Sequence, residues 1–344
     1  MADRGSAPTI ETVAAAAGVS IATVSRVLNG LPARPETTRR VHQAVAEVGY
    51  VPNALGKSLK TSTTSQIAFA VADVGNPVYL AMVRAVQRVL RGHGYRLVLH
   101  STDADPADEL AVLRSLGSRQ VDGLILCPIR VTEAHLRELR RAPAPVVVIG
   151  TLPEGTEVDN VRTDSRTGAE LAIRHLAGLG RTRIALVNGP IDTVPGQARG
   201  QGYQDGLAAA GLEFDPELVE TADFQLESGQ AATARLLATA DFDAVLGAND
   251  LIALGAMNAL RAAGRAVPED VAVVGIDNTD LTSLVWPPLT SVCLGAAERG
   301  RLAAELLVER LANRHGPPRW HTVAPRLVER ASSIGPGDPR QVQP

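Results

Sequence analysis

The strongest constraint on the fold is an alternation, from residue 66 onward, between short apolar runs and amphipathic stretches with helical spacing. The apolar runs are nearly continuous, as in buried parallel strands, and lie at 67–71, 96–99, 123–126, 146–149, 183–187, 244–246 and 271–274. The amphipathic stretches lie at 79–91, 108–118, 168–179, 200–210, 228–238 and 251–263. The alternation predicts parallel sheets with helices on both faces, and there is enough chain for two such units.

Polar residues follow several of the apolar runs, at the strand ends where open α/β sheets bind ligands. They are rich in Asn and Asp and lie at 73–77, 101–103, 188–190, 249–250 and 277–278. Asn and Asp can each hold two neighbouring sugar hydroxyls, and Arg199 could add a rigid fork of donors. In any one loop, the alternative is that these residues stabilise a turn or cap a helix. Their recurrence at successive strand ends favours a pocket.

The first sixty residues differ, because their pattern predicts three short helices. Gly18 is suited to end the first helix, and Ser20 is a good N-cap for the second. The third helix begins at Pro35 and ends at Gly49. The inner faces comprise Val13, Ala14, Ala17, Val24, Val27, Leu28, Thr37, Val41, Ala44, Val45 and Val48. This is the pattern of a helix-turn-helix, although an ordinary pair of antiparallel helices is the alternative.

The outer face of the second helix is free to enter the major groove of DNA. Ile21, Ala22 and Arg26 are predicted to contact base edges, and Arg26 could bind a guanine through two hydrogen bonds. The predicted phosphate contacts are Ser20, Thr23, Ser25 and Asn29. Residues 1–60 carry a net charge of +3 and the remainder −6. A basic head on an acidic body fits a nucleic-acid module attached to a domain with another partner.

A short segment follows the head. Pro52 and Asn53 can open a helix over 54–60, which is too short to be stable alone in water. Both lysines of the chain, Lys57 and Lys60, lie in this segment, which suits phosphate contact. A Ser/Thr-rich linker comes next.

The head and the body together resemble the LacI/GalR family of bacterial transcriptional repressors. In the head, the resemblance is carried by residues 14–18, by the motif Val-Ser-x-x-Thr-Val-Ser-Arg-Val-Leu-Asn at 19–29, and by Gly-Tyr-x-Pro-Asn-Ala-Leu at 49–55. In the body it is carried by Val-Gly-Asn-Pro at 74–77, Asn-Gly-Pro at 188–190, Ala-Asn-Asp-x-x-Ala-Leu-Gly at 248–255 and Pro-Pro-Leu-Thr-Ser at 287–291, among other motifs.

The resemblance implies a division of the chain. It implies an all-α helix-turn-helix headpiece at 1–50, a hinge helix and linker at 51–65, and an effector-binding domain at 66–334. That domain is expected to have two α/β lobes, similar to periplasmic sugar-binding proteins (type I). The Gly/Pro-rich segment 335–344 is predicted to be a disordered tail, and it lacks a leucine heptad.

The resemblance also implies site residues. Leu59 matches the hinge leucine that the family wedges into the minor groove when two hinges pair over the operator, and Gly56 departs from the alanine common there, at a cost of ~1 kcal/mol. Asn53 and Lys57 are expected to contact DNA beside Leu59. The implied effector contacts are Asn76, Tyr79, Asp103, Arg199, Phe224, Asn249, Asp250 and Asp277. Gly150 and Pro195 depart from residues seen in many members, so the effector's identity does not carry over.

Other classes of function are disfavoured. The chain has no G-x-G-x-x-G, Walker or G-x-S-x-G motif, and its seven histidines lack metal spacing. Its two cysteines do not form a disulfide framework. An exported solute-binding or sugar-binding protein would explain the body but not the head. Residues 1–8 also lack the apolar run of a signal peptide, so export is not expected.

We therefore expect a cytoplasmic homodimeric regulator, not an enzyme, that represses transcription from a pseudo-palindromic operator. Its effector is expected to be a sugar or a sugar derivative. No cofactor, metal or membrane partner is expected.

Overall fold

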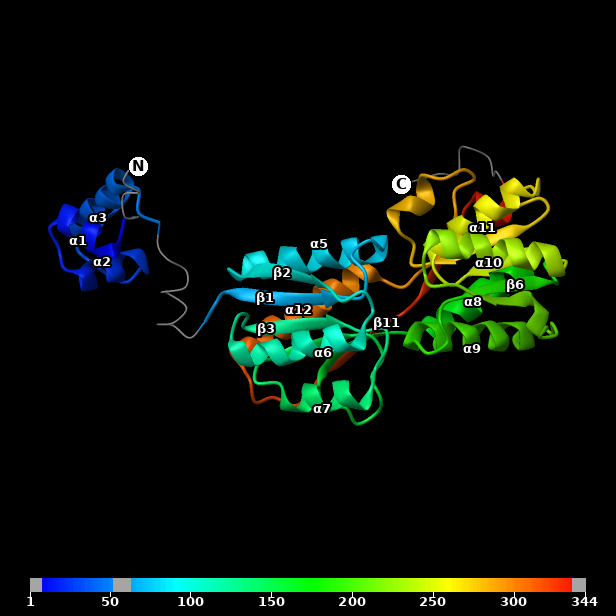
Figure 1. Cartoon of the computed structure of the whole chain (residues 1–344), viewed down its shortest axis with the longest axis horizontal. Coiled ribbons are helices and arrows are strands. Elements are labelled where there is room, and N and C mark those ends of the chain that lie inside the picture. The colour runs from blue at the N-terminus through cyan, green and yellow to red at the C-terminus, as the bar shows by residue number, and fades with distance from the viewer. Residues whose placement is uncertain (1–7, 52–62, 336–344) are drawn as a thin grey trace, which may run out of the picture. The chain divides into compact units, whose positions relative to one another are not determined.

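The computed structural model describes residues 8–51 and 63–335, and the chain separates into two compact units between Thr64 and Ser65 (Figure 1). The first unit contains α1 (Ile10–Ala17), α2 (Ile21–Leu28) and α3 (Pro35–Val48). These match the three predicted helices. The predicted helix at 54–60 lies outside the described residues.

The turn between α1 and α2 gives the first unit its helix-turn-helix geometry. The two helices bend by 103°, within the range of this motif. Gly18 ends α1 in the left-handed conformation with φ 61°, and Ser20 caps α2 by accepting a hydrogen bond from the Thr23 amide at 3.2 Å. Arg40 of α3 braces the turn by donating to the carbonyls of Ala17 and Gly18 at 2.5 and 3.1 Å.

The second unit consists of two α/β lobes, each built on a six-stranded sheet. The first lobe's sheet has the strand order β11-β5-β4-β3-β1-β2, and all its strands are parallel. Its strands are β1 (Gln66–Val71), β2 (Arg96–Ser101), β3 (Gly123–Cys127), β4 (Val146–Ile149), β5 (Asp159–Thr163) and β11 (Trp320–Val323). The two-lobed fold is the one that the sequence predicts.

The second lobe's sheet has the order β12-β10-β9-β8-β6-β7, with only β12 antiparallel to its neighbour. Its strands are β6 (Ile184–Asn188), β7 (Val219–Thr221), β8 (Ala244–Gly247), β9 (Ala272–Ile276), β10 (Thr290–Cys293) and β12 (Arg326–Val328). The chain passes between the lobes after β5, after β10 and after β11.

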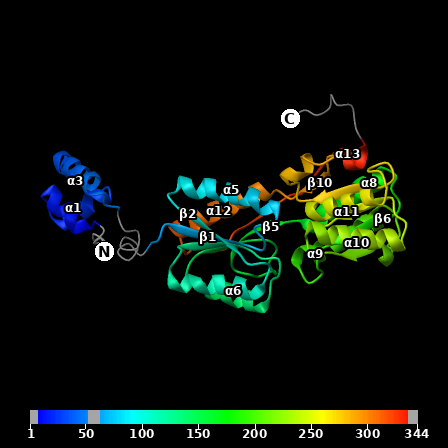
Figure 2. The same ribbon diagram turned by 45° about the horizontal axis from the view of Figure 1, so that its top comes forward.

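Helices cover both faces of each sheet (Figures 1 and 2). In the first lobe α5 (Pro77–Gly92) and α12 (Ala296–Ala312) cover one face, and α6 (Pro106–Ser115) and α7 (Glu133–Arg141) cover the other. In the second lobe α8 (Ser165–Gly178) and α9 (Val194–Ala209) lie opposite α10 (Leu226–Thr239) and α11 (Asp250–Ala262). The shorter helices are η1 (Leu116–Ser118), η2 (Pro216–Leu218), η3 (Asp280–Ser283) and α13 (Ala331–Ile334).

Burial on both faces explains why the strands are nearly continuous in apolar residues. In β1, Ile67 and Phe69 face the core under α5 and α12, whereas Ala68 and Ala70 face the opposite core. Successive side chains of a strand point to opposite faces, so a strand covered on both sides favours apolar residues at successive positions.

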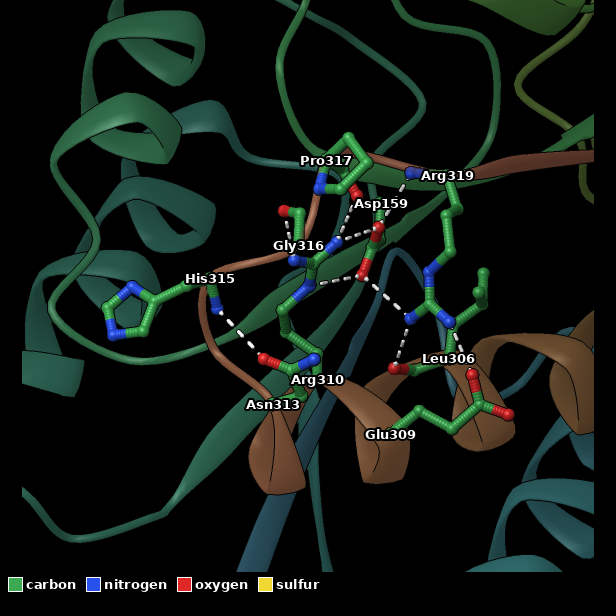
Figure 3. Close-up of polar contacts among 9 residues, drawn as sticks. All are labelled: Asp159, Leu306, Glu309, Arg310, Asn313, His315, Gly316, Pro317 and Arg319. Atoms are coloured by element: carbon green, nitrogen blue, oxygen red, sulfur yellow. Dashed lines mark hydrogen bonds and ion pairs between the residues drawn. The ribbon is translucent and has the colours of Figure 1, made fainter.

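β5 is a strand that the apolar pattern does not predict, because it begins with a buried charge. Asp159 is 3% exposed and accepts two hydrogen bonds from Arg310, at 2.9 and 2.7 Å, and one from the backbone amide of Arg319 at 2.8 Å (Figure 3). Burial raises the pKa of Asp159, but these bonds outweigh it and the net pKa is lowered. The cluster ties the start of β5 to the end of α12 and to the start of β11.

Within the ranges 8–51 and 63–335, every individual helix is too short or too polar to cross a membrane. Only α1 and α2 taken together reach the length and hydropathy of a membrane span, and they are sharply bent relative to one another.

Candidate functional site

A cleft with a cavity of about 110 Å³ lies between the two lobes. Six of the eight predicted effector residues line it: Asn76, Tyr79, Arg199, Phe224, Asn249 and Asp277. Asn76, Asn249 and Asp277 follow the carboxyl ends of β1, β8 and β9, as the sequence predicts for an open α/β sheet. The residues come from both lobes, so a ligand in the cleft would contact both.

Arg199 is the most constrained of these residues. Its guanidinium lies 5.9 Å from the ring centroid of Phe224 and 3.6 Å from Asp277 Oδ1, and it donates to the carbonyl of Ala248. Arg199 and Asp277 are 6% and 7% exposed. Burial lowers the pKa of Arg199 and raises that of Asp277, while the attraction between the two charges opposes both shifts.

The backbone around the cleft adopts conformations that are unfavourable for residues with a Cβ. Phe224 has φ 70°, Asp277 φ 111° and Asn278 φ 50°. The Phe224 ring lies so close to Gly189 that a Cβ there would be 2.0 Å from the ring. Such strain occurs where surrounding structure holds a functional site, so the wall of the cleft is pre-formed.

Asn76 and Asn249 cap helices as well as lining the cleft. Asn76 Oδ1 accepts from the amide of Val78 at 3.1 Å, at the start of α5. Asn249 Oδ1 accepts from the amide of Ile252 at 2.8 Å, and its Nδ2 donates to the carbonyl of Phe224 at 3.0 Å. Helix capping is the alternative role that the sequence offers for these residues. The structure shows that both residues cap a helix and also line the cleft.

The other two predicted residues, Asp103 and Asp250, do not line the cleft. Asp103 is exposed and accepts from Ser101 Oγ at 3.1 Å. Asp250 is 1% exposed, and its carboxylate accepts from Ser291 Oγ at 2.6 Å and from the Thr279 amide and hydroxyl at 2.6 and 2.8 Å. Burial, with the charge of Asp277, raises the pKa of Asp250 to about 7.

Sequence reasoning missed several residues of the lining. Arg299 of α12 is the charged one, and it is 6% exposed. A signal for it exists, because Arg299 falls on the same face of its helix as the buried Ala296, Gly300 and Ala303. The two positions that depart from the family pattern, Gly150 and Pro195, also line the cleft.

Direct contacts between the lobes surround the cleft. Arg130 of the first lobe binds Asp192 of the second through two hydrogen bonds of 2.8 and 3.1 Å. Gln225 Nε2 donates to Asp73 Oδ2 at 2.8 Å, and the Val194 amide donates to the Ile129 carbonyl at 2.8 Å. We refer to these three contacts as the interlobe clasp.

The predicted DNA-contacting residues cluster on α2 and at its ends. Ile21, Ala22 and Arg26 are exposed, and Ile21 is 46% exposed although it is apolar. Ser20 and Thr23 hydrogen-bond one another at 2.9 Å, and Asn29 Nδ2 donates to the carbonyl of Ser25 at 2.7 Å. The other three predicted residues, Asn53, Lys57 and Leu59, lie outside the described residues.

A helix-turn-helix unit joined to a two-lobed α/β unit with an interlobe cleft defines a class: DNA-binding proteins that carry a ligand-binding domain. Comparison with known proteins agrees. Residues 9–53 match the family described as "Bacterial regulatory proteins, lacI family", and residues 173–333 match "Periplasmic binding protein-like domain".

Relatives match over nearly their whole length. The HTH-type transcriptional regulator CelR of Thermobifida fusca is 38% identical over 96% of this chain and 99% of its own length. The ribose operon repressor of Escherichia coli K12 is 34% identical, over 94% of this chain and 99% of its own length.

Solved structures agree with these matches. The CelR–cellobiose complex has a TM-score of 0.72 at 37% identity, covering 94% of this chain and 99% of its own. The lac repressor dimer bound to operator and the anti-inducer ONPF has a TM-score of 0.84 at 26% identity, covering 95% and 99%.

The chain belongs to the LacI family of bacterial transcriptional regulators. It is accordingly a DNA-binding regulator of transcription and not an enzyme, as the sequence predicts. The alternative of an exported binding protein leaves the match at residues 9–53 without a role.

Proposed function

We propose that a sugar or sugar derivative binds in the interlobe cleft and controls the affinity of the chain for its operator. The observation that carries this proposal is the convergence of Asn76, Arg199, Asn249 and Asp277 from two lobes on one cleft. Amide and carboxylate groups suit sugar hydroxyls, and the Phe224 ring offers an apolar face for a sugar ring or a base. The structure of the relative CelR is described as a complex with cellobiose, which supports a carbohydrate as the class of ligand.

On the DNA side, we propose that α2 enters the major groove. Arg26, Ile21 and Ala22 would contact base edges, and Ser20, Thr23, Ser25 and Asn29 would contact phosphates. Asn53, Lys57 and Leu59 would act from a hinge at 51–65, between a headpiece at 1–50 and an effector domain at 66–334. The exposure of α2 supports the first part of this proposal.

We further propose that the chain acts as a homodimer on a pseudo-palindromic operator, in the cytoplasm, as a repressor. Large apolar side chains exposed on the second unit support a self-contact: Leu80 of α5 is 48% exposed, and Leu284 and Trp286 are 77% and 83% exposed. The lac repressor structure is itself described as a dimer on operator. Two-fold symmetry in the protein requires two half-sites in the DNA.

The mechanism is a shift between two populations. A ligand that prefers one arrangement of the lobes stabilises it, and the arrangement decides whether two heads can grip neighbouring half-sites. Ligand binding would therefore change operator affinity without touching DNA.

The experiment begins with selection of bound sequences from random duplex DNA by the purified full chain. The proposal predicts a palindromic consensus bound by a dimer, and predicts that Arg26→Ala reduces the preference for the consensus over random DNA by about tenfold or more, since a bidentate base contact contributes ~1–3 kcal/mol. Arg39→Ala, a change at an exposed position of α3, is the control. If Arg26→Ala kept the full preference, the assignment of α2 to base contact would be wrong.

A further inference from the structure

The side chain of Arg299 is a buried guanidinium without a partner in the wall of the cleft. It is 6% exposed, its Nε is fully buried, and within residues 63–335 its side chain makes no hydrogen bond or ion pair. A buried charge that lacks a partner is strongly unfavourable. Its presence at a ligand cleft therefore indicates that something else supplies the partner.

The packing of α12 holds Arg299 at the cleft. Gly300, the next residue, lies so close to α5 that a Cβ there would be 2.7 Å from the carbonyl oxygen of Met82. Ala296 and Ala303 are buried on the same face of α12. This close contact fixes the rotation of the helix about its axis, so Arg299 cannot turn to solvent without separating α12 from α5.

No other described group of the lining forms an ion pair or hydrogen bond with Arg299. Asp277, the one carboxylate of the lining, lies 3.6 Å from Arg199 and also attracts Arg299, so two guanidinium groups share one carboxylate. Burial raises the pKa of the Cys127 thiol to about 12 and that of the Tyr79 hydroxyl well above 10, so both are neutral at pH 7. The described lining thus holds two guanidinium groups and one carboxylate.

The two guanidinium groups belong to different lobes. Arg199 lies on α9 of the second lobe and Arg299 on α12 of the first, and the charge of Arg299 is close enough to lower the pKa of Arg199 beyond the effect of burial. Repulsion between the two like charges opposes any movement that brings the lobes closer together. An anion between them would convert that repulsion into attraction to both lobes.

We propose that the ligand of the cleft carries an anionic group, a carboxylate or a phosphate, that pairs with Arg299, and hence that the effector is an acidic sugar derivative and not a neutral sugar. This inference rests on the proposed function and specifies its ligand. Arg299 sets the specificity, while Asn76 and Asn249 remain suited to hydroxyl groups of the same ligand.

The first test uses the ligand-free full chain. Arg299→Met keeps an unbranched side chain and removes the unpaired charge, so we expect its melting temperature to rise by a few degrees. Arg301→Met is the matched control, because Arg301 lies on the same helix, is 47% exposed and pairs with Glu305 at 2.7 Å; its melting temperature should not rise. A lower melting temperature for Arg299→Met would show that the protein already neutralises this charge, and would overturn the inference.

The second test measures binding of matched probes by thermal shift and calorimetry: D-glucose, D-gluconate and D-glucose 6-phosphate, and cellobiose with cellobionate. We expect an acidic member to bind more tightly than its neutral partner, and Arg299→Met to weaken that binding by at least ~30-fold. Arg301→Met should bind like the parent. The gluconate and phosphate arms distinguish the two kinds of anion.

Two results separate this inference from the function on which it rests. A neutral sugar that binds as tightly as its acid and changes operator binding would defeat the inference and leave the proposed function standing. An acidic probe that binds through Arg299 but leaves operator affinity unchanged would support the anion site and count against the proposed control of DNA binding.

Discussion

At the scale of single residues, the cleft depends on how its buried charges are balanced. Arg199 offsets Asp277, with both groups more than nine-tenths buried. Removing one member of such a pair leaves the other charge in a medium that solvates it poorly. The two residues should therefore behave as a unit in ligand binding.

Arg199→Met tests this pairing. We expect effector affinity to fall by about 100-fold, because the variant loses the donors and leaves Asp277 without its nearest cation. Operator binding should persist, because Arg199 lies in the second unit and the proposed DNA-contacting residues lie in the first. An unchanged effector affinity would contradict the assignment, and simultaneous loss of operator binding and of the unfolding transition would indicate misfolding.

Asp250 predicts a pH dependence of stability. Its pKa in the folded protein is about 7, above the ~3.9 of an unfolded chain, so the folded state holds the proton more tightly. The stabilising contribution is full below about pH 4 and is lost as the pH rises towards 7. We expect the free energy of unfolding of the parent to fall over this range relative to Asp250→Asn, by at most ~4 kcal/mol. Parallel pH profiles from denaturant titration would contradict this.

Much of the cleft could be predicted from sequence, because polar residues after strand ends converge in an α/β sheet. The direction in which each side chain points could not be predicted. Asp250 follows Asn249 directly, yet its carboxylate turns back to Thr279 and Ser291, and only the fold brings these residues together. Arg299 was missed because a single arginine within a helix is usually exposed.

At the scale of secondary-structure elements, glycines determine how closely helices pack. A Cβ at Gly202 of α9 would be 2.1 Å from the carbonyl oxygen of Arg166 in α8, and one at Gly206 would be 2.7 Å from Ile173 Cβ. Gly202 and Gly206, four residues apart on α9, therefore serve the contact between α8 and α9.

Two glycine substitutions on this helix pair should have opposite signs. Gly202→Ala forces α8 and α9 apart, and we expect it to lower the free energy of unfolding by ~1–3 kcal/mol. Gly178→Ala, at an open position of α8 with no atom within 4 Å, should raise it by ~0.5–1 kcal/mol. Denaturant unfolding of both variants measures this, and equal effects would contradict the packing argument.

The apolar runs predicted seven strands of the two sheets, since burial on both faces removes polar positions from a strand. The strands that this pattern missed are short or partly polar. β7 and β12 are three-residue strands at sheet edges, and β5 begins with Asp159, whose burial depends on Arg310 from far along the chain. A long-range partner of this kind leaves no local signal.

At the scale of the whole molecule, the interlobe clasp holds the two lobes together beside the cleft. It joins Arg130 to Asp192, Asp73 to Gln225, and Ile129 to Val194. The side-chain contacts are partly exposed, so each contributes modestly and is screened by salt.

Weakening the clasp should open the cleft without altering its lining. We expect Asp73→Ala combined with Asp192→Ala to weaken effector binding by less than about tenfold, because part of the binding energy must then close the lobes. The radius of gyration of the effector domain from small-angle scattering should increase. Asp241→Ala, which removes a weak ion pair of 3.9 Å within the second lobe, is the control; a clasp variant that matched it in both measurements would contradict the role of the clasp.

The central claim is that ligand in the cleft and operator on the head are coupled through one equilibrium. Coupling of this kind is reciprocal, so effector must change operator affinity by the same factor as operator changes effector affinity. The decisive measurement is the effector dissociation constant of the full chain with and without saturating operator, set against the operator dissociation constant with and without effector. Our account predicts that the two dissociation constants change by the same factor, of about 5–150. An effector dissociation constant that is the same with and without operator would contradict it.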